Sequence, residues 1–130
     1  MATLTAKLTL VSTDISAQES FSLSSEKGLS TTNPVVGLST IAVTTVGANN
    51  IIQPRTDGQT YYVYVRHTGK DASGSAVTTT LNIEKTGDVV FGKLAAEEFA
   101  FFPCGGAAHG IQLEASSGTI VAEYAYYTKA

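Results

Sequence analysis

The stretch EEFAFFPCGGAAHGIQLEASSGTIVAEYAYYTK, Glu97–Lys129, decides the fold that we predict for this chain. It reads as an aromatic strand, a glycine-rich loop, a short alternating strand, a tight turn and a long alternating strand. That order is the pattern of a β-meander. The stretch also holds six of the eleven aromatic side chains of the protein. We therefore expect it to form the core of a β-sandwich.

Period-2 alternation extends to the rest of the chain. Residues 3–12 place leucines and an alanine on one side and threonines with Lys7 on the other, which predicts a first strand with one buried face. Residues 60–68, TYYVYVRHT, carry apolar or aromatic side chains on both sides. A strand of that kind is typical of the centre of a sheet, or of a surface that a neighbouring subunit covers.

Turn signals separate the predicted strands. Asp57-Gly58 and Thr86-Gly87-Asp88 predict tight hairpin turns, and residues 68–75 predict a flexible polar loop. Residues 26–34, EKGLSTTNP, are expected to form a loop or a weak strand. Residues 94–99, LAAEEF, are the one place where the pattern allows a helical turn.

Composition and length agree with an all-β protein. The chain has 130 residues, of which 43% are hydrophobic and 15% charged, and Thr, Ser and Gly fill the deficit of charge. Threonine suits a half-exposed strand because it is β-branched and polar. We predict a single β-sandwich domain of jelly-roll type over residues 1–130, with roughly eight to nine antiparallel strands.

The charge and the cysteine content exclude several classes of partner. The net charge of −3 comes without a basic patch, so no nucleic acid partner is expected. Cys104 is the single cysteine and cannot form an internal disulfide. No apolar run approaches the about 20 residues of a membrane helix, and the N-terminus lacks the apolar block of a signal peptide. We expect synthesis in a reducing cytoplasm and no membrane partner.

The residues that usually carry catalysis are few and poorly spaced. His67 is in phase with the apolar side of residues 61–67, so we expect it to meet a hydroxyl or a carbonyl. Cys104 and His109 share one glycine-rich loop without a group to orient the imidazole, which makes Cys104 a small hydrophobe that ends a strand. Glu97-Glu98 point to opposite faces and do not make a glycosidase pair.

Neither a metal nor a phosphate site is indicated. The sequence has no HxH, CxxC or HExxH spacing, as zinc would require. The glycines Gly105, Gly106 and Gly110 lie between strands and lack the helix start of a phosphate-binding loop, so we read them as a turn. We predict no catalytic residue, no metal and no cofactor.

Tyrosines provide the candidate site. Tyr62, Tyr64, Tyr126 and Tyr127 fall on strands whose two faces are both occupied by large side chains, so part of the set is expected to face outward. Tyrosine is enriched at interfaces because it combines apolar area with a hydroxyl. We predict a subunit interface at these four residues. A platform on which sugars stack and packing between the two sheets are the alternatives.

Three segments together resemble a known group of proteins: MATLTAKLTLVSTD at the start, YYVYVRHTG in the middle, and EEFAFFP with GIQLEASSGTIVAEYAYYTKA at the end. They are similar to small virion structural proteins of tailed phages that infect marine bacteria and cyanobacteria. The resemblance covers most of the chain and is one of strand pattern. It implies an all-β, non-enzymatic protein of the virion that serves as capsid decoration or cement, or as a small fibre, neck or tail component.

Three hypotheses of function follow. The first is a capsid decoration protein that forms a homo-oligomer, with a trimer favoured, and contacts the major capsid protein or another virion protein. In it, residues 3–12 are an arm that adds to the sheet edge of a neighbour. The second is a carbohydrate-binding module that stacks sugars on Tyr62, Tyr64 or Tyr126. The third is a small hydrolase, which requires His109 to meet Cys104 or a carboxylate in a closed pocket.

Overall fold

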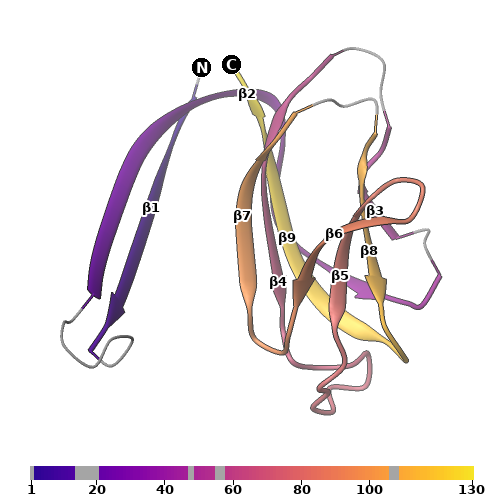
Figure 1. The fold of residues 1–130 in the computed structure, drawn as a ribbon. Helices are drawn as coiled ribbons and strands as arrows, with labels where there is room; N and C mark the ends of the chain where they lie inside the picture. Colours follow the sequence, from indigo (N-terminus) through magenta and orange to yellow (C-terminus); the bar gives the residue numbers. More distant parts are fainter. Residues whose placement is uncertain (1, 14–20, 47–48, 55–57, 106–108) are drawn as a thin grey trace. The chain divides into compact units, whose positions relative to one another are not determined.

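A computed structural model describes residues 2–13, 21–46, 49–54, 58–105 and 109–130, and all regular elements in them are β-strands (Figure 1). The nine strands confirm the predicted all-β class and strand number. Asp57 and Gly106, which belong to a predicted turn and to the predicted glycine loop, lie outside the described residues. The strands are β1 (Ala2–Ser12), β2 (Phe21–Val43), β3 (Asn49–Ile52), β4 (Tyr61–His67), β5 (Leu81–Lys85), β6 (Val89–Leu94), β7 (Phe99–Cys104), β8 (Ile111–Ala115) and β9 (Ile120–Lys129).

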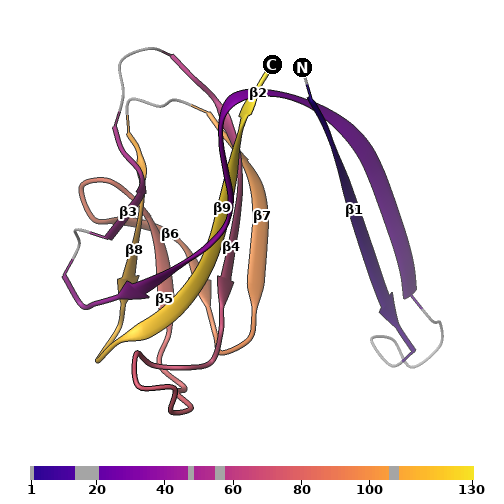
Figure 2. The ribbon, with the colours of Figure 1, turned by 180° about the vertical axis from the view of Figure 1, so that it is seen from behind.

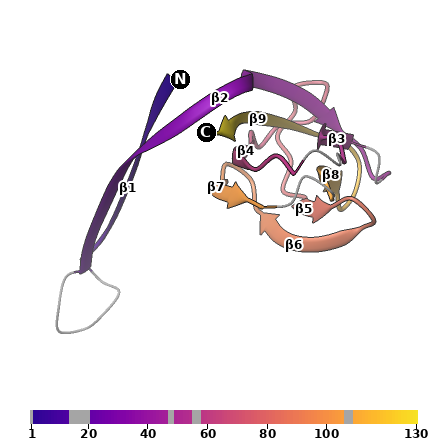
Figure 3. The ribbon, with the colours of Figure 1, turned by 90° about the horizontal axis from the view of Figure 1, so that it is seen from above.

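The strands form two antiparallel sheets. One has five strands in the order β1-β2-β9-β4-β7, and the other has four in the order β3-β8-β5-β6. Viewed along the strands, β4, β7 and β9 make one layer and β3, β5, β6 and β8 the other (Figure 3). One apolar cluster with members from both sheets fills the space between these layers. The arrangement is that of a β-sandwich, whereas the jelly-roll topology stays a prediction.

β4 supplies the centre of this core. Tyr61, Val63, Val65 and His67 are buried, and the residues between them are half-buried, as the alternation predicts. Antiparallel ladders to β9 on one side and to β7 on the other confirm that this strand is central. Because both edges of β4 are paired, its backbone polar groups are satisfied along its whole length.

The prediction of a β-meander over Glu97–Lys129 is wrong. β7 and β9 lie in the five-stranded sheet on either side of β4, whereas β8 lies in the four-stranded sheet between β3 and β5. The chain therefore crosses from one sheet to the other after β7 and crosses back after β8. Alternation predicts where strands are, but it carries no information about which strands pair, and here the shared core decides the pairing.

The chain divides into two compact units, Met1–Thr32 with Lys129–Ala130, and Asn33–Thr128. The core described above belongs to the second unit. The first is a hairpin in which β1 pairs with β2 in continuous register from Ala2 opposite Thr31 to Ser12 opposite Phe21 (Figure 2). The single domain over residues 1–130 stays a prediction.

The hairpin corrects one expectation. Of the two alternatives expected at residues 26–34, a loop or a weak strand, the loop is wrong, because β2 runs unbroken from Phe21 to Val43 and places Lys27 and Gly28 opposite Ala6 and Thr5 of β1. Residues 3–12, the expected arm that adds to the sheet edge of a neighbour, pair with β2 of their own chain along one edge, and the addition to a neighbour stays a prediction. Backbone pairing overrides local turn signals in this segment.

The predicted burial of one β1 face is wrong as well. The register places Leu4 opposite Leu29 and Leu10 opposite Leu23, so their side chains share one face of the hairpin. Leu8, Leu10 and Leu23 are 45%, 48% and 40% exposed. The hairpin thus has the alternating sequence of a strand with one buried face. Among the described residues of its unit, however, no second layer covers that face.

Residues 95–98, between β6 and β7, form a tight turn and not the helical turn that the sequence allowed at residues 94–99. Glu98 N–H donates to the Ala95 carbonyl over 3.1 Å, and Glu97 takes a φ of 70°. A positive φ at the third position is the geometry of a type II turn. The Glu98 carboxylate also accepts the Ala95 N–H over 2.7 Å, which closes the turn that leads into β7.

Hydrogen bonds to Asp71 hold the polar loop at residues 68–75. The carboxylate accepts the Ser73 hydroxyl over 2.6 Å, the Ser73 N–H over 2.8 Å and the Ser75 N–H over 2.9 Å. These donors, the Ser73 hydroxyl first, lower the pKa of Asp71 below its ordinary value, because they stabilise the ionised carboxylate.

We expect this loop to lose support in acid. A depressed folded-state pKa means that the Asp71 contribution to stability is complete above the unfolded-state pKa and is lost as the pH falls through the lower, folded-state value. An NMR titration of the Asp71 side-chain carboxyl should give a pKa below the ordinary one, and Ser73→Ala should raise it. An unchanged pKa in Ser73→Ala would contradict the assignment of the Ser73 hydroxyl as the main cause.

Gly110 allows the crossing from β7 to β8. It has a φ of +61°, and a Cβ atom there would lie 2.6 Å from the Ile52 carbonyl oxygen and 2.8 Å from both the Pro54 nitrogen and the Thr86 hydroxyl. Two of these three atoms are backbone, which cannot move aside as a side chain can. Gly118 has the same φ with nothing within 4 Å of the position a Cβ would take.

These two glycines make a matched pair for a stability measurement. Gly118→Ala should cost about 1 kcal/mol of unfolding free energy, which is the penalty of the left-handed conformation alone. Gly110→Ala should cost about 3 kcal/mol or more, since overlap with backbone atoms adds to the same penalty. Urea denaturation of both variants gives the difference, and equal costs would show that the crossing is not tightly packed.

Candidate functional site

Side chains of β9, β4 and β7 that point away from the core form one continuous surface. The registers place Tyr62 between Tyr127 and Pro103, and Tyr64 between Ala125 and Phe101. Directly opposite residues of an antiparallel pair lie on the same face. We name this surface the outer aromatic face, and its aromatic members are Tyr62, Tyr64, Phe99, Phe101 and Tyr127.

The outer aromatic face is apolar at the β7 side and charged at one end. Phe99 and Phe101 are 61% and 41% exposed, and the rings of Tyr62 and Phe101 stack with an interplanar angle of 11° and centroids 6.2 Å apart. Arg66 and Glu123 face each other at 3.7 Å on the same surface. Two exposed phenylalanines on an edge strand are uncommon outside contact surfaces.

The structure brings together three of the four predicted interface residues. Tyr62, Tyr64 and Tyr127 lie on the outer aromatic face, but Tyr126 lies opposite Val63 on the core side of the sheet. The Tyr126 ring meets Tyr61 edge to face, at a centroid distance of 5.6 Å. Tyr126 therefore contributes to packing between the two sheets.

Phe99 and Phe101 are the members that the sequence did not predict as surface residues, since the aromatic strand was expected to be core. Only Phe102 of its three phenylalanines packs against the core cluster. Successive residues of a strand point to opposite faces, so the sequence alone indicates that Phe102 lies on the other face from Phe99 and Phe101. The alternation does not show which face is turned to the core. The ladder with β4 shows it, because Phe102 lies opposite the core residue Val63.

His67 has a structural role. It is fully buried, its Nδ1 accepts the Gly69 N–H over 2.9 Å, and its Nε2 lies 2.8 Å from the Thr79 carbonyl oxygen. Since Nδ1 accepts, the proton is on Nε2, which donates to Thr79. The predicted contact with a carbonyl is confirmed, and the histidine ties the loop after β4 to the segment before β5.

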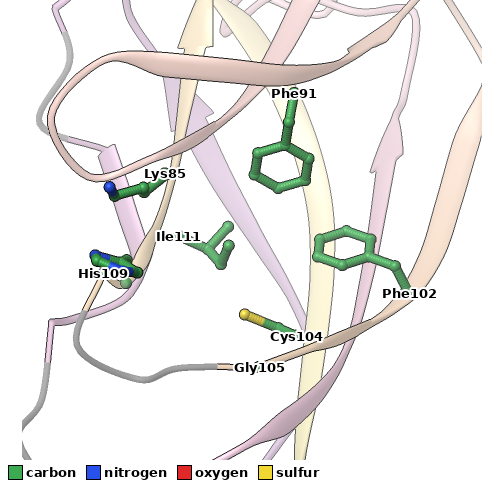
Figure 4. Close-up of a pocket in the computed structure, with 8 residues that line it drawn as sticks. Lys85, Phe91, Phe102, Cys104, Gly105, His109 and Ile111 are labelled. Carbon is green, nitrogen blue, oxygen red and sulfur yellow. The ribbon is translucent and has the colours of Figure 1, made fainter.

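Cys104 and His109 line one open pocket of about 250 Å³ where the chain crosses from β7 to β8 (Figure 4). Phe91, Phe102 and Ile111 supply its apolar wall. In the close-up, Lys85 and His109 lie together on one side of the pocket, and Phe91 and Phe102 lie across from them. The described lining residues include no carboxylate, so the pocket itself offers no acid to orient the imidazole.

Three carboxylates meet on the four-stranded sheet, and the sequence did not point to them. Glu84, Asp88 and Glu114 each offer an oxygen within 4.8 Å of the others, and Glu84 is 2% exposed. Among the described residues they are the group that could hold a divalent cation. The Gln112 amide already donates to Glu84 and to Asp88, over 2.8 Å each, and places N–H dipoles between two of the carboxylates.

The bond between Gln112 and Glu84 should contribute strongly to stability. Gln112→Leu leaves the buried Glu84 carboxylate without this donor and should lower the unfolding free energy by about 2 to 4 kcal/mol. Removing both partners in Gln112→Leu with Glu84→Leu should restore most of the loss, because no charge is then left buried at that position. Urea denaturation measures both variants; a double variant as unstable as the single one would contradict this account.

No segment that the structure describes forms a helix of the length and apolarity needed to cross a membrane. Comparison of the chain with protein-family models, with curated protein sequences and with solved structures gives no match. The candidate site is therefore defined by its own geometry, the stacked and partly exposed aromatic rings on one face of β9, β4 and β7.

Proposed function

We propose that this protein is a non-enzymatic structural component of a phage virion, in the role of a capsid decoration or cement protein that stabilises the shell through contacts between its own copies. The observation that carries the proposal is the exposure of Phe99 and Phe101 beside Tyr62 and Tyr64 on one regular sheet face. The strand-pattern resemblance to small virion proteins supports the same reading. The protein is made in the host cytoplasm and resides in the virion.

The energetics suit an assembly that is built from many modest contacts. Covering one phenylalanine side chain completely yields roughly 1.5 to 3 kcal/mol, so a partly exposed pair offers a few kcal/mol per subunit. Such a contact is weak by itself and becomes strong when it is repeated over a shell. A homo-trimer that contacts the major capsid protein, or another virion protein, fits this scheme and the local threefold positions of a capsid.

Self-association should depend on the outer aromatic face. Phe99→Ser with Phe101→Ser removes its two most exposed rings, and sedimentation velocity should show oligomers of the 13.5 kDa chain shifting to smaller species. Phe91→Ser is the matched control, because Phe91 is 54% exposed but lies on β6, away from this face. A wild-type protein that is monomeric at all concentrations would overturn the proposal.

Carbohydrate binding is the second candidate function. The nearly parallel rings of Tyr62 and Phe101 resemble a stacking platform, and Arg66 and Glu123 offer hydrogen-bonding groups on the same surface. A glycan array separates the two functions, since a glycan-binding monomer favours the module and an oligomer without glycan binding favours assembly. A tail, neck or fibre position is distinguished from a capsid position by the symmetry of the protein in purified virions.

A further inference from the structure

β1 is a long, regular and unprotected sheet edge. It lies at the end of the five-stranded order, so among the described strands it is paired on one side alone, by β2. Its 11 residues contain no proline and one charged side chain, Lys7. Its ladder continues without the register shifts that interrupt β3 with β8 and β5 with β6. Proteins normally block such an edge with charge, proline, a bulge or a short length.

β1 has one neighbouring strand, β2, whereas β2 also has β9 as a neighbour in the sheet order. A two-stranded ribbon by itself is marginally stable in water, and each further strand with an apolar face adds stability. Leu8 and Leu10 of β1 are nearly half exposed, and so is Leu23 of β2. An added strand beside β1 would extend the ladder past this edge and shield the flanks of these leucines.

Among the described edge strands, the best fit to this edge is β1 of a second copy. The other edge strands, β3, β6 and β7, have 4, 6 and 6 residues, and β7 contains Pro103, which has no N–H to donate. An antiparallel pair of β1 strands matches in length. When residues of equal parity face each other, it also keeps every leucine of both copies on one face.

The charge of Lys7 favours some alignments of the two antiparallel β1 strands over others. Pairing centred on Lys7 sets two ammonium groups opposite each other, which is destabilising. Pairing centred on Ala6 sets Lys7 opposite Thr5 of the second copy and Leu4 opposite Leu8 of the second copy. Pairing centred on Leu8 also separates the lysines but sets Leu4 opposite Ser12, so it forms fewer contacts between leucines.

We propose that β1 pairs antiparallel with β1 of a second copy across a twofold axis at Ala6. This pairing places the two hairpins in the order β2-β1-β1-β2 with a continuous leucine face. This contact rests on the assembly function proposed above and names one of its surfaces. It uses the first unit of the chain, whereas the outer aromatic face belongs to the second, so the two contacts are separable by mutation.

Disulfide trapping tests the contact and its register. In a Cys104→Ser background, which removes the single native thiol, Ala6→Cys should give a covalent dimer in most molecules under mild oxidation. Directly opposite residues have Cα atoms about 4.5 to 5.5 Å apart, within the range that a disulfide spans. Leu4→Cys and Leu8→Cys should each cross-link several-fold less alone and should form a heterodimer when they are mixed.

A second variant tests the contact without a covalent bond. Ala6→Glu places two carboxylates opposite each other at the centre of the proposed pairing, while Lys27 lies opposite the new carboxylate within the same hairpin. Dimerisation should weaken at least tenfold in sedimentation velocity, with circular dichroism unchanged. Assembly of the wild type without any cross-link at Ala6→Cys would overturn this contact and leave the assembly function standing. Equal cross-linking at all three positions would overturn the register, and a wild-type monomer at every concentration would overturn both proposals.

Discussion

The structure depends on β4, a strand paired on both edges whose side chains alternate between two uses. Toward the four-stranded sheet, Tyr61, Val63 and Val65 fill the core, and His67 closes it with two hydrogen bonds to backbone groups. Away from it, Tyr62 and Tyr64 build the surface that we propose for assembly. A slip of one residue in its register would exchange these two sets, so the core and the outer aromatic face are specified by the same pairing.

The second constraint is the crossing of the chain between the sheets. β7 and β9 flank β4, yet β8, which lies between them in sequence, pairs with β3 and β5. The backbone reaches β8 through Gly110, where carbonyl and nitrogen atoms of Ile52 and Pro54 approach too closely to leave room for a side chain. This arrangement links the two layers covalently on both sides of β8 and brings its apolar residues Ile111 and Leu113 into the shared core.

Polar side chains inside the molecule bond to groups of the same chain, whereas several large apolar side chains are exposed on its surface. The buried histidine and the Gln112 amide serve backbone or side-chain partners of the same chain. By contrast, phenylalanines of β7 and leucines of the hairpin lie exposed on regular strands. Exposed apolar side chains on regular strands are typical of surfaces that contact other proteins, and our proposal of assembly rests on this distribution.

The amino-acid sequence by itself determined the class, the number and approximate place of the strands, the two faces of β4 and the structural role of His67, since these follow from alternation and turn chemistry along the chain. Only the tertiary structure decided which strands pair. It therefore decided that Phe99 and Phe101 face outward, that Tyr126 faces inward, and that residues 26–34 are strand. It also assembled Glu84, Asp88 and Glu114 from separate segments. The reason is that period and composition are local properties, whereas sheet partners and the side of a strand that is covered depend on residues far away in the chain.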